Sequence, residues 1–142
     1  MISARQTAAL LAAAGLGASL YLSAVELARG QVPLACVNSG IINCDLVTAS
    51  PQSRVGPVPI AVLGALWFLV LLALLAMEGR VGVRAAAAMQ LGWTTAGLLV
   101  VFYLVYAELF LIGALCLWCT VVHVLVVLLF LLVLARVAGA SA

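Results

Sequence analysis

The chain has 142 residues, of which 68% are hydrophobic and only 7% are charged, and its net charge is +2. Soluble domains average about half apolar and about a quarter charged residues, so this composition excludes a water-soluble globular protein. The length fits one domain, which we assign to residues 1–142. We expect membrane lipid, and no nucleic acid, around it.

Charged residues divide the chain into four apolar windows, at 6–25, 55–77, 85–107 and 109–135. Each window supplies the roughly 20 apolar residues that a helix needs to cross about 30 Å of hydrocarbon. The windows are continuously apolar rather than alternating, which favours helices over a β-barrel. We therefore predict an all-α integral membrane protein. Its four-transmembrane-helix bundle is expected to have approximate spans 6–26, 57–77, 85–111 and 115–136, with a long outward-facing loop at 27–56.

Residues 1–25 also resemble a signal peptide, with Arg5 as the basic end and a core rich in alanine and leucine. The apolar run is longer than a typical signal core, and Tyr21 interrupts the small-residue pattern that precedes a cleavage site. We expect this segment to be retained as the first helix.

The basic residues predict the orientation. With four spans, both termini and the connection at 78–84 share one side of the membrane, which holds Arg5, Arg80, Arg84 and Arg136 against Glu78. The other side holds Arg29 and Arg54 against Glu26, Asp45 and Glu108. The positive-inside rule then predicts that both termini lie in the cytoplasm, and in a bacterial cell the protein would lie in the inner membrane. The loop and the turn at Gly113 face the periplasm, and Glu108 is expected near this interface, without a need for burial.

The polar segment at 29–57 is too long for a passive connection, because loops of this size are usually functional or disordered. Its apolar residues predict packing against the mouth of the bundle: Val32, Leu34, Ile41, Ile42, Leu46 and Val47. Pro57 and Pro59 are expected to open the second helix, where a missing N–H costs little.

All four cysteines fall on the predicted outer side. Cys36 and Cys44 lie in the loop, and Cys116 and Cys119 lie at the start of the fourth helix. Residues three apart share a helix face, so the last two sulfurs can approach each other. A helix N-terminus stabilises a thiolate, which is the form that attacks disulfides. In the oxidising periplasm, disulfides form and persist.

Several interpretations of these cysteines remain open. They could be packing residues, staples in a non-enzymatic membrane protein, or ligands of zinc. We favour none of these, because the CxxC pair is placed for chemistry and no other metal ligands accompany the thiols, so no metal is expected. Two pairs, one exposed and one at the lipid boundary, instead suggest a relay by thiol–disulfide exchange. Electrons would pass from a soluble thiol protein to a lipid-soluble acceptor, a quinone.

The sequence resembles the vitamin K epoxide reductase family over essentially its whole length. The resemblance rests on C-x7-C followed by D-x-V-x-x-S, on the later CxxC with a histidine four residues on, and on VPIAVLGALWF at 58–68. These residues are Cys36, Cys44, Asp45, Val47, Ser50, Cys116, Cys119 and His123. The disulfide-bond oxidoreductase B family has its cysteine pairs in the reverse order.

The resemblance implies a four-helix bundle around a quinone site, with ubiquinone or menaquinone as the acceptor. It implies that Cys119 faces the quinone, that Cys116 exchanges with Cys44, and that Cys36 is most accessible to the partner. His123 would hydrogen-bond a quinone oxygen, or else a neighbouring carbonyl. Ser50 would be a functional hydroxyl, or else a turn or helix cap.

Two departures from the family pattern matter. We expect no fused thioredoxin-like domain after the bundle, and therefore a separate periplasmic thioredoxin-like partner. GPVP at 56–59 replaces a single Gly-x-Pro, which affects the expected wall of the quinone pocket. Trp118 is expected to be an interfacial anchor or a stacking surface for the quinone.

Overall fold

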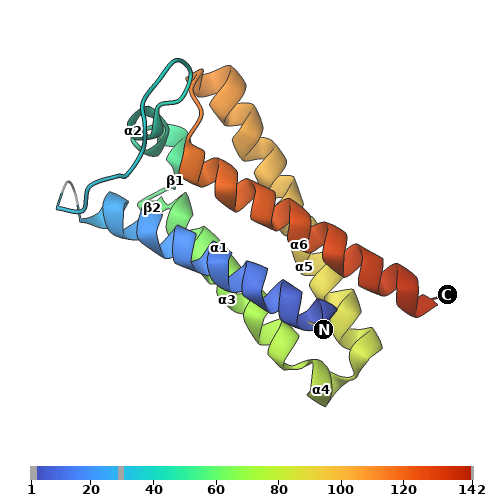
Figure 1. Cartoon of the computed structure of the whole chain (residues 1–142). Coiled ribbons are helices and arrows are strands. Elements are labelled where there is room, and N and C mark those ends of the chain that lie inside the picture. The colour runs from blue at the N-terminus through green and yellow to red at the C-terminus, as the bar shows by residue number, and fades with distance from the viewer. Residues whose placement is uncertain (1–2, 29–30, 142) are drawn as a thin grey trace.

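The computed structural model describes residues 3–28 and 31–141, and most of them are helical. Four long helices lie side by side: α1 (Ala4–Leu27), α3 (Ile60–Ala76), α5 (Val83–Tyr106) and α6 (Leu117–Ser141) (Figure 1). Helix α1 packs against α3 and α6, and α5 packs against α3 and α6, which closes the bundle. Arg29, which we had counted with the outer side, lies outside the described residues.

Three of these helices are long and apolar enough to cross a membrane: α1, α5 with the π-helical turn η2 (Ala107–Ile112), and α6 as far as Gly139. Helix α3 is also apolar but has 17 residues. The class predicted from composition, a mostly helical protein with helices that could span a membrane, is confirmed. The number of spans stays a prediction.

The second long helix begins at Ile60 with Pro59 as its N-cap residue, so Pro59 opens the helix as expected, whereas the expectation for Pro57 was wrong. Residues 54–59 form a small antiparallel hairpin of β1 (Arg54–Val55) and β2 (Val58–Pro59). Gly56 has a φ of 61°, the left-handed conformation that this tight turn requires. The hairpin holds the backbone extended, and the helix starts where the pairing ends.

The loop lies at one end of the bundle, and the N-terminus, the C-terminus and α4 (Glu78–Val81) lie at the other (Figure 1). The loop contains two short helices, α2 (Cys44–Thr48) and the 3-10 helix η1 (Pro51–Ser53). Val47 is buried, as expected, whereas Ile41 and Leu46 are 62% and 49% exposed. Leu46 does not pack on the bundle, because α2 turns only one face toward it, and Ile41 lies in the turn before α2.

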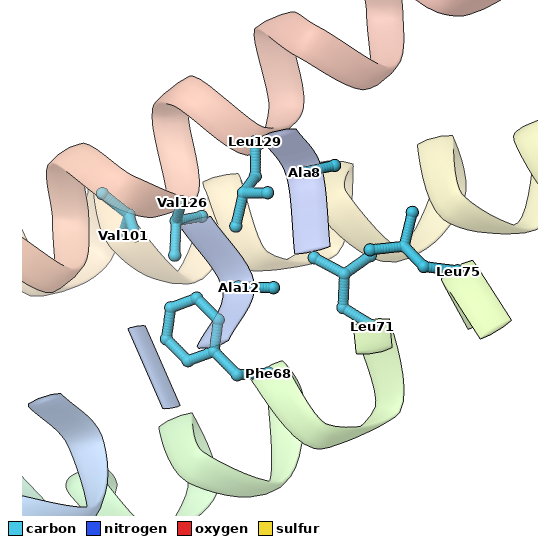
Figure 2. Close-up of a cluster of buried hydrophobic side chains, with 8 residues drawn as sticks. All are labelled: Ala8, Ala12, Phe68, Leu71, Leu75, Val101, Val126 and Leu129. Atoms are coloured by element: carbon cyan, nitrogen blue, oxygen red, sulfur yellow. The ribbon is translucent and has the colours of Figure 1, made fainter. Parts of the chain in front are cut away.

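The apolar core lies between the four helices, around Phe68 and Leu129 (Figure 2). Both side chains are fully buried. Gly15 of α1 lets the Phe68 ring approach, since a Cβ atom there would lie 2.2 Å from a ring carbon. Small residues on α1 therefore bring α1 and α3 close together, and the helices diverge toward the loop end (Figure 1).

A polar network joins the helices at the end that holds the termini. The Arg136 guanidinium donates to both oxygens of Glu78, at 2.8 and 2.9 Å, and to Gln90 Oε1 at 3.1 Å. Burial of Glu78 opposes ionisation, but its hydrogen bonds and charge pairing with Arg136 hold the pKa of Glu78 below its usual value. The buried charge at this end is therefore fully paired.

Candidate functional site: a cysteine cluster beside an apolar cavity

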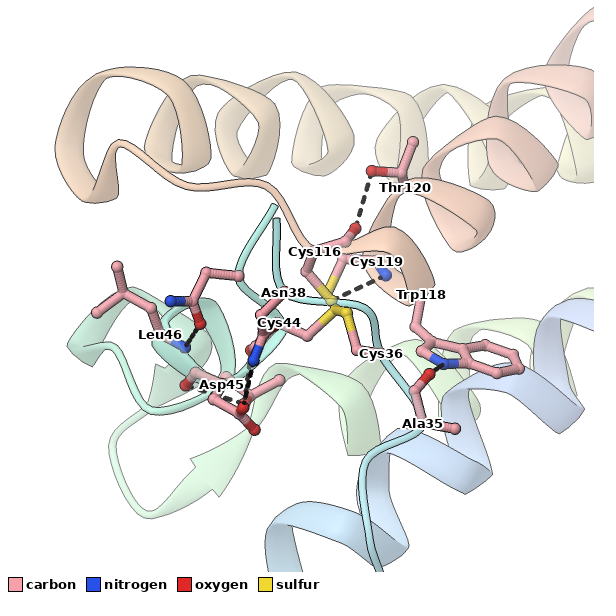
Figure 3. Close-up of a disulfide and its surroundings, with 12 residues drawn as sticks. Ala35, Cys36, Asn38, Cys44, Asp45, Leu46, Cys116, Trp118, Cys119 and Thr120 are labelled. Carbon is pink, nitrogen blue, oxygen red and sulfur yellow. Dashed lines mark hydrogen bonds between the residues drawn. A yellow bond between two sulfur atoms is a disulfide. The ribbon is translucent and has the colours of Figure 1, made fainter. Parts of the chain in front are cut away.

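Four cysteines come together at the loop end of the bundle. Cys36 and Cys44 form a disulfide, and Cys116 and Cys119 are free thiols. Cys44 and Cys116 are fully buried in one cluster, and the other two cysteines pack against it. Figure 3 shows the disulfide lying directly beside the CxxC pair. The structure therefore brings together both pairs that the sequence placed on one side.

A short backbone pairing holds the loop against the CxxC segment. The Leu115 N–H donates to the Ile41 carbonyl at 2.8 Å, and the Asn43 N–H donates to the Leu115 carbonyl at 2.9 Å. Because Leu115 is extended in this bridge, α6 begins at Leu117 and not at 115. Ile41 and Asn43 lie just before Cys44, and Leu115 lies just before Cys116. These backbone hydrogen bonds therefore fix the distance between the loop disulfide and the CxxC pair.

Cys116 stands at the start of α6, where backbone N–H groups have no helical acceptor. The Cys119 N–H donates to the Cys116 sulfur at 3.2 Å (Figure 3). The hydrogen bonds from the side chain and backbone of Cys119, together with one from the Trp118 backbone, lower the pKa of the Cys116 thiol against the opposing effects of burial and the Glu108 charge. Cys116 is thus the thiol that most readily becomes a thiolate.

Trp118 does not line the cavity, so the stacking role expected for it does not describe its contacts, and the interfacial role stays a prediction. Its indole N–H donates to the Ala35 carbonyl at 2.8 Å, and its ring lies 4.9 Å from that of Tyr21. The Tyr21 hydroxyl accepts from the Ala35 N–H at 2.8 Å and donates to the Pro33 carbonyl at 2.9 Å. These two aromatic residues, which we call the Tyr21–Trp118 clamp, hold the loop segment just before Cys36.

A cavity of about 470 Å³ opens between the four helices below α2 and η1. Cys119, His123 and Ser50 all line it, so the three residues predicted to face a quinone lie around one space. Most of its other lining residues are apolar. Cys119 also packs against the cysteine cluster, so it connects the two halves of the site.

The alternatives for Ser50 and His123 are distinguished by their contacts. Ser50 precedes η1, but its hydroxyl donates back to the Val47 carbonyl at 2.7 Å and does not cap that helix. The His123 side chain is 8% exposed, and within the described part of the chain no carbonyl accepts a hydrogen bond from it. Its ring nitrogens are thus available to the cavity.

Glu108 is 4% exposed, so the expectation that it need not be buried was wrong. The π-helical turn η2 directs it inward, where it lines the cavity and accepts a long hydrogen bond of 3.5 Å from the Cys116 N–H. Glu26 lines the same cavity from α1. The signal was present in the sequence, because both acids interrupt apolar windows, and polar groups at such positions are usually functional.

Two tryptophans, Trp67 of α3 and Trp93 of α5, form one wall of the cavity. Trp67 donates to the Trp93 carbonyl at 3.3 Å, and Trp93 donates to the Trp67 carbonyl at 3.1 Å. Their rings are nearly parallel, with an interplanar angle of 13°. Gly97 gives room for this wall, since a Cβ atom there would lie 2.5 Å from the Trp67 ring.

The structure has helices that could span a membrane, a disulfide packed on a CxxC pair, and a cavity that one of the CxxC thiols lines. Together these features define a membrane thiol oxidoreductase. The model of the vitamin K epoxide reductase family matches residues 6–134. The chain belongs to this family. Comparison with individual curated proteins gave no match.

Proposed function

We propose that the chain is a quinone-dependent thiol–disulfide oxidoreductase of the bacterial inner membrane. It oxidises a separate periplasmic thioredoxin-like protein and passes two electrons through its two cysteine pairs to ubiquinone or menaquinone, which supports disulfide bond formation. The observation that carries this proposal is the double position of Cys119, which packs against the cysteine cluster and also lines the apolar cavity.

The proposed topology has four spans, with the termini in the cytoplasm and the cysteines facing the periplasm. Helix α3 rises about 26 Å at 1.5 Å per residue, close to the roughly 30 Å of a hydrocarbon core. Its flanking hairpin and α4 supply the remaining length. The arginines of the terminal end, Arg5, Arg80, Arg84 and Arg136, support the cytoplasmic assignment.

The first part of the electron path runs through the loop. Cys36 is partly exposed whereas Cys44 is buried, so the partner's thiolate attacks Cys36. The reduced loop then exchanges with the CxxC pair through a transient bridge between Cys44 and Cys116, which pack in one cluster. An oxidised loop with a reduced CxxC pair, as in this structure, is the state that follows exchange and precedes quinone reduction.

The second part occurs in the cavity. Bound there, the quinone supplies a two-electron acceptor. Cys119 faces it, and Cys116 and Cys119 together lose two S–H bonds, form one S–S bond and release two electrons and two protons. His123 donates a hydrogen bond to a quinone oxygen, and Ser50 closes the cavity from above.

The cavity fits such a ligand in size and chemistry. Its volume of about 470 Å³ lies within the range of small-molecule sites. A mostly apolar lining with a few convergent polar groups suits a ring that carries two carbonyl oxygens and an isoprenoid tail. The parallel tryptophan wall offers a flat surface for the ring.

The test uses the purified full-length chain in lipid nanodiscs with a reduced thioredoxin-like protein and either ubiquinone or menaquinone. We expect stoichiometric oxidation of the partner and formation of quinol, and neither with Cys119→Ala. A chain whose cysteines serve only as structural staples would leave both substrates unchanged. Stoichiometric bound zinc would instead support the metal-site alternative.

A further inference from the structure

Glu108 is a buried carboxyl group for which disulfide exchange has no use. It lies beside Cys116 and faces the same cavity as Cys119 and His123. No cation pairs with it among residues 3–28 and 31–141, where the ion pair is that of Glu78 with Arg136. An acid that is kept unpaired in an apolar site needs a reason, because burying its charge costs free energy.

Proton accounting gives a reason. Oxidation of two thiols to a disulfide releases two protons, and a quinone that becomes a quinol takes up two. The cavity is apolar, so these protons need a carrier between the sulfurs and the quinone oxygens. Glu108 is hydrogen-bonded to Cys116 on one side and exposed to the cavity on the other.

Electrostatics determines which of the two groups, Cys116 or Glu108, holds the proton before quinone reduction. The Cys116 thiolate and the Glu108 carboxylate repel each other in low-dielectric surroundings, so the pair holds one proton and one negative charge between them. The hydrogen bonds to the Cys116 sulfur favour the charge on sulfur. The proton therefore rests on Glu108.

We propose that Glu108 is the general acid that gives the quinone the proton released by Cys116. This rests on the proposed function. Before the step the site holds a Cys116 thiolate, a Cys119 thiol and a Glu108 carboxylic acid. After it, the site holds the Cys116–Cys119 disulfide and a Glu108 carboxylate, and two electrons and two protons have left as quinol. The total charge is minus one on both sides.

The other titratable groups around the cavity are placed differently. Glu26 lies on α1, with one buried oxygen that has no hydrogen-bond partner among the described residues, and it interacts at longer range with Arg54 of the hairpin. No hydrogen bond joins Glu26 to Cys116 in the described structure. His123 lies on α6 below Cys119 and faces the cavity. Glu108 is the acid that contacts the residue whose thiol loses its proton, through the backbone N–H of Cys116.

The experiment uses Glu108→Gln, which keeps an oxygen to accept the Cys116 N–H but cannot carry the proton. The first measurement needs no quinone: thiolate absorbance of the reduced CxxC pair is followed against pH. Because Glu108 is protonated when Cys116 ionises, Glu108→Gln removes no charge at that stage, and we expect the Cys116 thiolate to form over the same pH range in the variant. The second measurement is the single-turnover rate of quinol formation, which we expect to fall about 10²-fold.

An unchanged Cys116 thiolate together with slower quinone reduction is a combination that a purely structural role does not produce. Glu78→Gln, the same change at a buried acid far from the site, is the control and should alter neither measurement. Glu108→Asp should recover part of the rate. A wild-type rate or a shifted thiolate titration in Glu108→Gln, or the same fall in rate in Glu26→Gln, would overturn the proposal.

Two results keep the proposal separate from the function on which it rests. If the wild-type protein forms no quinol, the proposed function fails. If Glu108→Gln does not fold, infrared difference spectra of the wild-type protein decide: quinone reduction should convert a carboxylic acid band into a carboxylate band. Absence of that conversion in an active wild-type protein would overturn the proton role alone.

Discussion

The two ends of the bundle each contain a buried glutamate, and the two are treated in opposite ways. At the end with the termini, Glu78 receives two hydrogen bonds from Arg136. At the loop end, Glu108 has a single long contact with a backbone N–H and faces two thiols and a cavity. The first arrangement neutralises a charge and joins helices. The second leaves an acid unpaired where protons have to move, and this difference separates a structural end from a reactive one.

The largest expected effect comes from removing the central thiol of the reactive end. Cys116→Ala should abolish quinol formation and partner oxidation completely, because the CxxC pair can no longer form its disulfide. The thermal unfolding midpoint should change little, because the Glu78–Arg136 pair at the other end is untouched. Quinone absorbance and thermal unfolding in detergent measure the two. Residual steady turnover in this variant would contradict the assigned electron path.

Removing the ion pair at the structural end should have the opposite effect, which is a loss of stability with little change in activity. Arg136→Met leaves the Glu78 charge buried without its partner, and we expect a loss of about 3 kcal/mol in the free energy of unfolding. The quinone-reduction rate of the folded fraction should stay within about twofold of wild type. The double variant Glu78→Gln/Arg136→Met should recover part of the stability. A selective loss of activity in Arg136→Met would show that the two ends are not independent.

The Tyr21–Trp118 clamp sharpens the comparison within the reactive end. Tyr21→Phe removes two hydrogen bonds to the loop segment before Cys36, and Trp118→Phe removes one. At about 1 kcal/mol per bond, we expect exchange between the loop and the CxxC pair to slow roughly 30-fold in Tyr21→Phe and about fivefold in Trp118→Phe. Hydrogen exchange of residues 33–36 should rise in the same order. Equal protection in all three proteins would argue against a positioning role.

The smallest expected effect is a pH dependence of stability at the structural end. The pKa of Glu78 is lowered in the folded state, so its contribution is fully present above the unfolded value of about 4.5 and is lost as pH falls through the lowered folded value. Unfolding of wild type and Glu78→Gln should therefore differ at neutral pH and converge in acid. A constant difference across this range would mean that the charge of Glu78 contributes nothing.

Sequence reasoning succeeded where a single physical property decides the outcome. Lipid as solvent requires long apolar helices, so the helical membrane class could be predicted from the charge-free windows. The cysteines could be assigned to one group by counting spans. The hairpin at 54–59, the inward direction of Glu108 and the contacts of Trp118 could not. Each depends on pairing with residues distant in the chain, such as the contact of Trp118 with Ala35, which no local pattern encodes.

The π-helical turn at Ala107–Ile112 makes the site sensitive to the deletion of a single residue. A π turn carries one residue more than an α turn, and such bulges often occur at functional sites. Deleting one residue within it would restore regular α-helix and rotate the preceding side chains by about 100° relative to Gly113 and the CxxC segment. Glu108 would then point toward lipid. A one-codon change could therefore silence the chemistry while leaving a bundle that still inserts and folds.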